Sequence, residues 1–458
     1  MDKNKLPYVL LAAFMAAFLA ITLRGLSTIQ PGDENVYYYM GRLVSEGKMP
    51  YRDFFFAHPP LQIYLIALVY KAFGFSIAAL KSVSMISTLI TAFFVFKIAK
   101  EKFGSSQAVI SSLLFLFSYG VMFNSVFSFG IEIAMMFLII GAYFLFNRSN
   151  YVFAGIFFGV AGITRLLSLV PIFIVFCIVF LSNKKSFLRL SSAFLIVFLL
   201  VNGIFALFLK DAYLSPVYKF HLLKSFGGRE NFREYFDIVK LNWILFFSAF
   251  LFIFIKDKRA ANPFFTVSAV YLIFLLILKR IFGFYFIVIF PFLAIIGGYS
   301  ILWIYKNVSF QKKFEMLILA LLTLIFAWNL AADILFLEKV GFGGFERGKD
   351  LADFVSSNSD KNTILFGDDS VVPLLALSAN KKIAFDFVDT NNEVFLSGLA
   401  DLNSVLGRLK GNDVLFIIRS RQGISYFNEV KGFLNQNCEF LSQFHDKTEG
   451  DYLVYRCN

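Results

Sequence analysis

The first three quarters of the chain alternate between long apolar stretches and short polar loops. Eleven of these stretches predict membrane-spanning helices, although several are shorter than the roughly 20 residues that a straight span needs. They are residues 8–26, 77–99, 107–123, 127–147, 151–164, 166–182, 188–209, 240–256, 264–279, 283–304 and 315–336. A shorter apolar stretch, residues 60–73, starts at a Pro-Pro pair and predicts a helix in the membrane interface.

The pattern changes near residue 338, where turn signals begin to separate short apolar runs. The glycine-rich sequence at 341–344 predicts a break in the chain. Strands are expected at residues 363–367, 383–387, 414–418 and 452–456, and helices at 345–358, 395–409 and 424–435. Strands that alternate with helices predict a small α/β domain. We therefore expect a transmembrane domain over residues 1–337 and a soluble α/β domain over residues 338–458.

Composition supports a polytopic α-helical membrane protein. Of the 458 residues, 58% are hydrophobic and 16% are charged, and the mean hydropathy is +0.71. Soluble proteins are roughly 45–50% apolar and about 25% charged. Residues 8–26 are too long for a cleavable signal peptide and lack a small-residue cleavage site, so they predict the first span.

The net charge of +12 does not indicate a nucleic-acid partner, because no basic stripe lies on a soluble module. Lysine and arginine instead occupy every loop on one side of the predicted membrane. These residues include Lys97, Lys100, Lys102, Arg148, Lys184, Lys185, Arg189, Lys256, Lys258 and Arg259. By the positive-inside rule this side is cytoplasmic. The N-terminus is then cytoplasmic, and loops 27–58 and 210–239 and the C-terminal domain are extracytoplasmic.

Three cysteines do not form a disulfide framework. Cys177 lies inside an apolar run, where we expect it simply to be packed. Cys438 and Cys457 can pair if the C-terminal domain lies in an oxidising compartment, and the sequence does not decide this.

Ionisable side chains recur at the predicted outer ends of the spans, where such groups are functional candidates by default. The set comprises Asp33, Glu34, Asp53, His58, Glu132, Arg165, Lys279 and Arg280. Individually they also have structural interpretations: Asp33 is a typical helix N-cap, and Arg165 can snorkel. Glu132 is a typical capping residue, and His58 can cap a proline turn. Gathered on one side of a membrane, however, they form a cluster that is unfavourable in free energy in the absence of a substrate.

The first loop carries a motif series that resembles a known class. The series is Asp33-Glu34 followed by Tyr37, Gly47-Lys48-Met49-Pro50-Tyr51-Arg52-Asp53-Phe54, His58-Pro59-Pro60-Leu61, and Phe73-Gly74. It looks like the GT-C class of membrane glycosyltransferases, and is most similar to the protein O-mannosyltransferase and aminoarabinose-transferase-like family. The resemblance extends over roughly residues 8–305. It implies a GT-C fold with loop 27–58 as the catalytic loop.

The resemblance also implies roles for individual residues. Asp33 is expected to be the general base, with Glu34 beside it. The donor in this class is a sugar on a polyprenyl phosphate, and its phosphate is expected to contact Arg165, Lys279 and Arg280, and His58. His58 stands where the aminoarabinose-transferase pattern has lysine, and a neutral histidine offers one donor instead of a fixed charge.

Four further side chains receive supporting roles from the resemblance. Glu132 and Asp53 are expected to assist the base, to hold a metal or to orient the loop. Tyr37 and Tyr285 are expected to contact substrate. The sequence does not choose among the roles of the acidic pair.

The residue types suit inverting transfer, which needs a carboxylate base near the acceptor hydroxyl and cations for the departing phosphate. Arginine and lysine supply that charge without a metal, so the sequence requires no cofactor, and a divalent metal stays open. The expected partners are a polyprenyl-phosphate-linked sugar, an extracytoplasmic protein, lipid or glycan acceptor, and membrane lipid. Two alternatives are a transporter or flippase for lipid-linked or anionic substrates, and a receptor whose C-terminal domain binds ligand.

Overall fold

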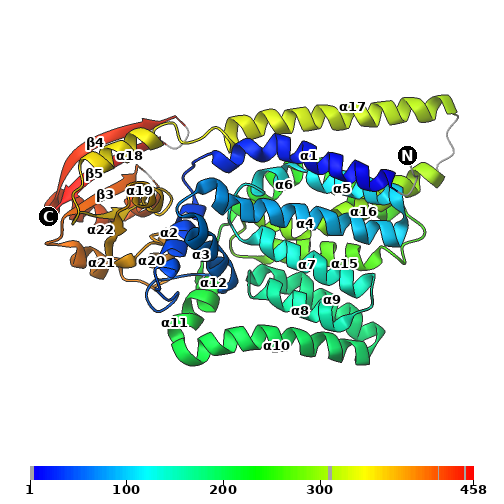
Figure 1. Cartoon of the computed structure of the whole chain (residues 1–458), viewed down its shortest axis with the longest axis horizontal. Helices are drawn as coiled ribbons and strands as arrows, with labels where there is room; N and C mark the ends of the chain where they lie inside the picture. Colours follow the sequence, from blue (N-terminus) through cyan, green and yellow to red (C-terminus); the bar gives the residue numbers. More distant parts are fainter. Residues whose placement is uncertain (1–4, 308–311, 421, 448–449) are drawn as a thin grey trace. The chain divides into compact units, whose positions relative to one another are not determined.

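The computed structural model describes residues 5–307, 312–420, 422–447 and 450–458 (Figure 1). The chain forms two compact units, each built from three separate stretches. We call them the helical unit (residues 1–26, 81–203 and 227–342) and the mixed unit (residues 27–80, 204–226 and 343–458). The predicted catalytic loop and the C-terminal segment therefore belong to the same unit, although they lie far apart in the sequence.

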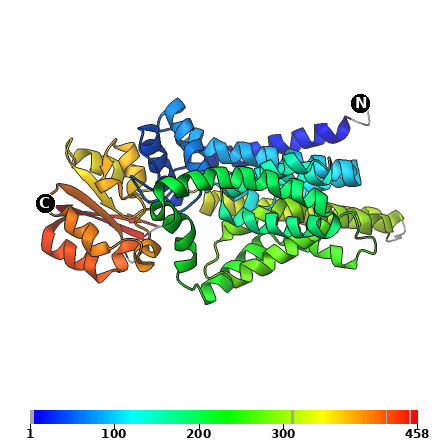
Figure 2. The same ribbon diagram turned by 90° about the horizontal axis from the view of Figure 1, so that it is seen from below.

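Long apolar helices dominate the helical unit and run roughly along one direction (Figures 1 and 2). In chain order they are α1 (Leu6–Ser27), α4 (Ile77–Phe103), α5 (Ser105–Leu116), α6 (Tyr119–Asn124), α7 (Ile131–Phe146), α8 (Tyr151–Gly162), α9 (Leu169–Ser182), α10 (Lys184–Leu209), α13 (Arg229–Leu241), α14 (Trp243–Phe250), α15 (Asn262–Ile277), α16 (Phe290–Asn307) and α17 (Lys312–Phe336). Short helical turns η1 (Leu166–Ser168), η3 (Leu251–Phe254), η4 (Gly283–Ile289) and η5 (Leu337–Gly341) join some of them.

The predicted count of eleven spans is not confirmed, although each predicted stretch is largely helical. Five helical stretches among the described residues are long and apolar enough to cross a membrane: Leu6–Ser27, Ile77–Phe103, Lys184–Leu209, Gly283–Asn307 and Ala320–Lys339. A sixth results if Arg229–Leu241 and Trp243–Phe254, bent by 83°, form one broken span. The other predicted spans correspond to shorter apolar helices of 10–17 residues. The span predicted at 107–123 is divided at Phe117 and Ser118, between α5 and α6.

Close helix packing in the helical unit depends on small residues. A Cβ on Gly298 of α16 would lie 2.2 Å from Ser111 Oγ of α5, and one on Gly297 would lie 2.4 Å from Ser248 Oγ of α14. Small residues at these positions let neighbouring backbones approach closely, as is usual for helices in membranes. Helix α16 is therefore enclosed, and most of its residues are buried.

The mixed unit joins short helices from three parts of the chain to one sheet. The first two parts give α2 (Asp33–Ser45), α3 (Leu61–Phe73), α11 (Asp211–Leu214), η2 (Ser215–Lys219) and α12 (Phe220–Leu223). The C-terminal part gives α18 (Gly348–Ser357), α19 (Val372–Ser378), η6 (Ala384–Asp386), α20 (Asn392–Leu396), α21 (Leu402–Leu409), η7 (Gly423–Tyr426) and α22 (Asn428–Asn437). The stretch predicted as an interface helix is α3.

Five strands form the sheet in the order β2-β1-β3-β5-β4. They are β1 (Ile364–Gly367), β2 (Lys382–Ile383), β3 (Val414–Arg419), β4 (Cys438–Asp446) and β5 (Gly450–Cys457). Strand β1 pairs in parallel with β2 and β3, whereas β5 is antiparallel to both β3 and β4. Phe366 and Phe416 pack with Val405 and Phe433 of α21 and α22 in one apolar core. The predicted fold class, a helical membrane protein with a small α/β domain, is confirmed.

Several local predictions differ from the structure. The helix expected at 424–435 is divided at Phe427 into η7 and α22. The strand expected at 383–387 ends at Ile383, because Phe385 and Asp386 have φ of 54° and 55°, which no strand accepts. Strand β4 was missed because no turn signal separates it from the preceding helix. The helix expected at 395–409 is divided at Gly398, whose φ is 74°.

The cysteines resolve into one pair and one single thiol. Cys438 and Cys457, the first residue of β4 and the last of β5, form a disulfide. Cys177 is exposed on α9, so the expectation that it is packed is wrong. Exposure of an apolar helix face is ordinary for a chain that lies in lipid, because the bilayer replaces the protein core as the surrounding medium.

Candidate functional site

Helix α2 presents one exposed carboxylate at its start. The N-cap residue is Gly32, so the interpretation of Asp33 as an N-cap is wrong, and Asp33 is the first helical residue. A carboxylate in this turn is stabilised by the positive end of the helix dipole. Asp33 is exposed, whereas Glu34 is only 2% exposed, and its Oε2 accepts a hydrogen bond from the Tyr38 hydroxyl at 2.9 Å. Asp33 is therefore the more accessible carboxylate of the two.

Acidic residues of the C-terminal domain lie close enough to Asp33 to interact with its charge. Asp368 and Asp369 follow β1 directly, and Asp389 follows η6. Burial raises the pKa of Asp369 well above its usual range, and the nearby charges of Asp368, Asp389 and Asp33 raise it further, whereas Arg419 opposes the shift. Part of the Asp369 side chain remains accessible to solvent. Burial and the neighbouring acidic charges therefore both favour the protonated form of Asp369.

Asp389 shows the same effect with different opposing partners. Burial of its carboxyl and the negative charge of Asp33 raise the pKa of Asp389 to about 6, against a hydrogen bond from the Asn391 N–H and the positive charge of Lys224. Lys224 follows α12, so the middle stretch of the mixed unit also contributes a charge here. None of Asp369, Asp389 and Lys224 was predicted as a site residue from the sequence.

We expect Asp389→Asn to stabilise the protein above about pH 6 and to leave its stability unchanged below pH 4. The folded-state pKa of about 6 exceeds the ordinary 3.8. The native state thus binds more protons than the unfolded chain between these values, and it loses stability as the pH rises through them. Asparagine removes that loss, which we put at roughly 1 kcal/mol for a group with accessible surface. Thermal unfolding at pH 4 and pH 8 measures the stability difference between Asp389→Asn and the wild type. Equal changes in melting temperature at both pH values would contradict the interpretation.

Two histidines meet beside α2. The rings of His58 and His221 are stacked, with centroids 5.5 Å apart and an angle of 27° between their planes. His58 Nε2 lies 3.1 Å from the Tyr37 hydroxyl, and His221 Nε2 donates to the Ala57 carbonyl at 2.8 Å. Tyr51 donates from its hydroxyl to the His58 carbonyl at 2.7 Å. The structure therefore brings the predicted residues Tyr37 and His58 together and adds His221, which sequence analysis did not identify.

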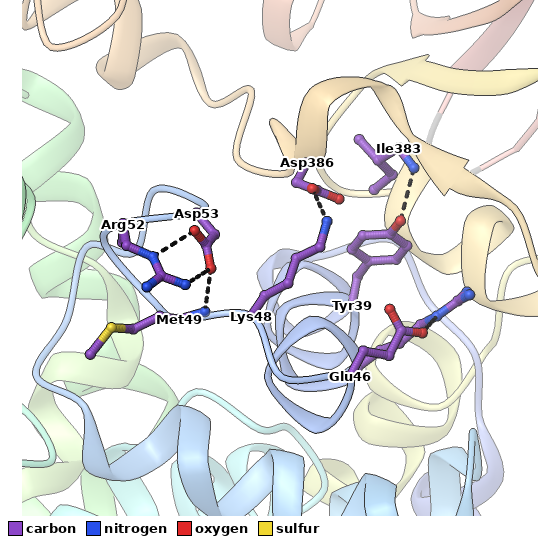
Figure 3. Close-up of polar contacts among 9 residues, drawn as sticks. Tyr39, Glu46, Lys48, Met49, Arg52, Asp53, Ile383 and Asp386 are labelled. Atoms are coloured by element: carbon purple, nitrogen blue, oxygen red, sulfur yellow. Dashed lines mark hydrogen bonds and ion pairs between the residues drawn. The ribbon is translucent and has the colours of Figure 1, made fainter.

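Asp53 holds the turn between these residues and α2 (Figure 3). Its carboxylate accepts hydrogen bonds from the Arg52 guanidinium at 2.8 and 2.9 Å and from the Met49 N–H at 2.7 Å. These contacts lower the pKa of Asp53 to about 2. Tyr51 within this turn has φ of 69°, an unusual value for a bulky residue, so the turn is held in a strained conformation. Among the roles expected for Asp53, these contacts favour orientation of the loop.

In the helical unit, Glu132 and Arg165 are both buried. Glu132 lies in the first turn of α7, is 1% exposed, and its Oε2 accepts from Ser84 Oγ at 3.4 Å. Arg165 follows α8 and is 4% exposed, so it does not extend its guanidinium to the surface of the chain. Lys81 of α4 is also buried, with Nζ donating to the Gly25 carbonyl at 3.3 Å. Sequence analysis missed Lys81 because it stands alone at the start of an apolar run.

Lys279, Arg280 and Tyr285 lie between α15 and α16. Lys279 is exposed, and its carbonyl accepts hydrogen bonds from the Gly227 N–H at 2.7 Å and from Asn231 at 2.8 Å. Arg280 forms an ion pair with Glu230 at 3.0 Å. The Tyr285 carbonyl accepts from the buried Tyr271 hydroxyl at 2.9 Å. These residues belong to the helical unit, whereas the predicted residues of the catalytic loop belong to the mixed unit.

The described parts of the chain contain no ready set of metal ligands. Across residues 5–307, 312–420, 422–447 and 450–458, no group of three or more histidine, cysteine, aspartate or glutamate side chains is placed to hold a metal ion. A metal role for Glu132 or Asp53 therefore gains no support from the arrangement of their neighbours.

Comparisons with known proteins agree on a fold. Residues 57–209 match the family model described as dolichyl-phosphate-mannose-protein mannosyltransferase. No curated protein sequence matches the chain. The crystal structure of ArnT from Cupriavidus metallidurans in the apo state is similar at a TM-score of 0.71 and 14% identity, covering 97% of each chain. The same protein bound to undecaprenyl phosphate is similar at a TM-score of 0.68 and 14% identity, again covering 97% of each chain.

An archaeal protein shows the same fold at lower similarity. The oligosaccharyltransferase AglB from Archaeoglobus fulgidus, in complex with an inhibitory peptide and a dolichol-phosphate, matches at a TM-score of 0.58 and 10% identity. That match covers 98% of this chain and 74% of AglB. The predicted resemblance to the GT-C class is confirmed.

Proposed function

We propose that this chain, which has the fold of the GT-C membrane glycosyltransferases, transfers a sugar from a polyprenyl phosphate to an extracytoplasmic acceptor hydroxyl. The observation that carries the proposal is the exposed Asp33 carboxylate at the start of α2, in a chain that matches ArnT over 97% of its length. A mannosyltransferase family model that begins at Ala57 supports it. ArnT with undecaprenyl phosphate and AglB with dolichol-phosphate support the class of donor.

The proposed step is a single displacement at the anomeric carbon. Asp33 accepts the proton of the acceptor hydroxyl while the acceptor oxygen forms a bond to the anomeric carbon. At the same time the bond between that carbon and the phosphate oxygen breaks. Polyprenyl phosphate leaves with the bonding electron pair, and the anomeric configuration inverts. A retaining enzyme instead needs a second carboxylate as nucleophile. Cations that contact the leaving phosphate stabilise its growing negative charge.

Histidine, arginine and lysine side chains are the candidates for that phosphate. His58, Arg165, Lys279 and Arg280 carry over, as proposals, the phosphate contacts that the resemblance implies. The contacts of His58 with Tyr37 and His221 fix its ring, which a phosphate-binding imidazole requires. Because the described residues offer no cluster of metal ligands, we propose no step through a metal.

The decisive experiment incubates the purified protein with a panel of polyprenyl-phosphate sugars and an acceptor mixture, and measures release of polyprenyl phosphate. The proposal expects release with at least one donor, together with a glycosylated acceptor of inverted configuration. The acceptor peptide tethered to the archaeal oligosaccharyltransferase makes a peptide a suitable first acceptor. Movement of an intact lipid-linked sugar across a vesicle membrane, without cleavage, would favour a flippase instead.

We further propose that the C-terminal domain is extracytoplasmic, which the Cys438–Cys457 disulfide supports. A reporter that is active only outside the cytoplasm should be active when fused after Leu337. The matched control is the same reporter fused after Asp257, in a basic loop on the predicted cytoplasmic side, where it should be inactive. The reverse pattern would invert the proposed topology.

A further inference from the structure

Two hydrogen-bond donors on either side of Asp33 converge on one carbonyl of the C-terminal domain. The Gly32 N–H donates to the Ser370 carbonyl at 3.0 Å, and Asn35 Nδ2 donates to the same oxygen at 2.8 Å. Asn35 Nδ2 also donates to the Gln30 carbonyl at 2.8 Å, and Asn35 is only 2% exposed. Asp33 and Glu34 are therefore bracketed by contacts to a turn that lies far away in the sequence.

That turn is itself tied to the sheet. The Ser370 N–H donates to Asp368 Oδ1 at 3.0 Å, and the Ser370 hydroxyl donates to the same oxygen. The Asp368 N–H donates to the Ile417 carbonyl of β3 at 2.8 Å. Asp368 is 1% exposed and its Oδ2 lies 3.7 Å from Arg419 Nε at the end of β3. A continuous series of contacts thus runs from β3 through the turn to the residues beside Asp33.

Two further contacts hold α2 and the loop after it to the same domain (Figure 3). The Ile383 N–H donates to the Tyr39 hydroxyl at 2.8 Å, and the Lys48 ammonium pairs with Asp386. Asp386 and Phe385 both have φ near 55°, a strained conformation that residues other than glycine rarely adopt. Strain of this kind persists where surrounding contacts fix the chain, and here it lies opposite α2.

From these contacts we propose that the turn Asp368–Ser370 is a positioning element that sets the Asp33 carboxylate for transfer, with Asn35 and Asp368 as the positioning residues. The inference rests on the proposed function for its activity readout only. Misplacement of a reacting group by about 1 Å costs on the order of 10²-fold in rate. A purely structural contact would instead change the amount of folded protein and leave the rate of each folded molecule unchanged.

The first test is Asn35→Asp, a nearly isosteric change that replaces the donating amide with an oxygen facing two carbonyls. It should lower kcat by about 10- to 100-fold, with KM for the lipid-linked donor unchanged within about twofold. Ser370→Ala, which removes one hydroxyl contact and no backbone contact, should give a smaller loss of kcat and covers the case in which Asn35→Asp does not fold. The matched control is Asn358→Asp, since the Asn358 amide, at the C-cap of α18, donates locally to the Phe354 carbonyl.

The second readout is amide hydrogen exchange of α2 in the full chain, which requires no activity. Asn35→Asp should speed exchange over residues 33–38, whereas Asn358→Asp should not. The proposal would be overturned if kcat were unchanged in both Asn35→Asp and Ser370→Ala. It would also be overturned if the loss of activity only followed the amount of folded protein. If the wild-type chain transfers no sugar from any donor, the proposed function fails. Amide hydrogen exchange then decides whether the turn holds α2. Unchanged exchange in Asn35→Asp would overturn the positioning role.

Discussion

Asp33→Asn is expected to lower the rate of sugar transfer by about 10²- to 10⁴-fold, which is the usual contribution of a positioned general base. Asparagine has nearly the same shape as aspartate and suits the first turn of a helix, so α2 should form normally. The loss should appear in kcat, because an amide cannot accept the proton of the acceptor hydroxyl. Binding of the lipid-linked donor should change little.

Release of polyprenyl phosphate from a saturating donor measures this effect in purified, correctly inserted protein. The matched control is Asp350→Asn, since Asp350 also lies exposed in the first turn of a helix of the mixed unit. Its carboxylate forms an ion pair with Arg347 at 2.7 Å. Glu34→Gln identifies which carboxylate acts, because its amide oxygen can still accept from Tyr38. Wild-type turnover in Asp33→Asn, or a larger loss in Glu34→Gln, would refute the assignment of Asp33.

The predicted fold class depended on features that are local in the sequence. The apolar runs located the helices, and the motif series from Asp33 to Gly74 placed loop 27–58 in the GT-C class, because its residues are nearly consecutive. The number of spans was less predictable. Gly130, with φ of 77°, and Ser118 interrupt apolar sequence that looks continuous, so that spans expected to be whole are shorter helices.

The surroundings of Asp33 were not predictable in the same way. Asn35 and Ser370 lie 335 residues apart, and no motif links them. Asp368 and Asp369 directly follow the strand expected at 363–367, and neither carboxylate was predicted as a site residue. Its proximity to α2 depends on how β1, β3 and α19 pack, which a single sequence does not encode locally. His221 and Asp389 were missed for the same reason.

Gly367→Ala is expected to destabilise the C-terminal sheet by at least about 3 kcal/mol, as is typical where a residue is forced into a forbidden backbone conformation against a fixed neighbour. Gly367 ends β1 with φ of 139°, and a Cβ there would lie 1.8 Å from the Ile417 carbonyl oxygen. That oxygen belongs to the backbone of the central strand β3, so it cannot move aside as the end of a side chain can. The melting temperature of the purified protein and the protease resistance of residues 343–458 measure the change.

The control is Gly407→Ala in α21, where an added Cβ meets nothing within 4 Å. It should be neutral or stabilise the helix by about 0.5–1 kcal/mol. Equal melting temperatures for the two variants would contradict the assigned register of β1 and β3. The same Ile417 carbonyl accepts the Asp368 N–H at 2.8 Å, directly before the turn that contacts Gly32 and Asn35. Gly367→Ala should therefore also reduce transfer per folded molecule. The added methyl group would disturb the hydrogen bond between the Asp368 N–H and the Ile417 carbonyl, which holds that turn in place.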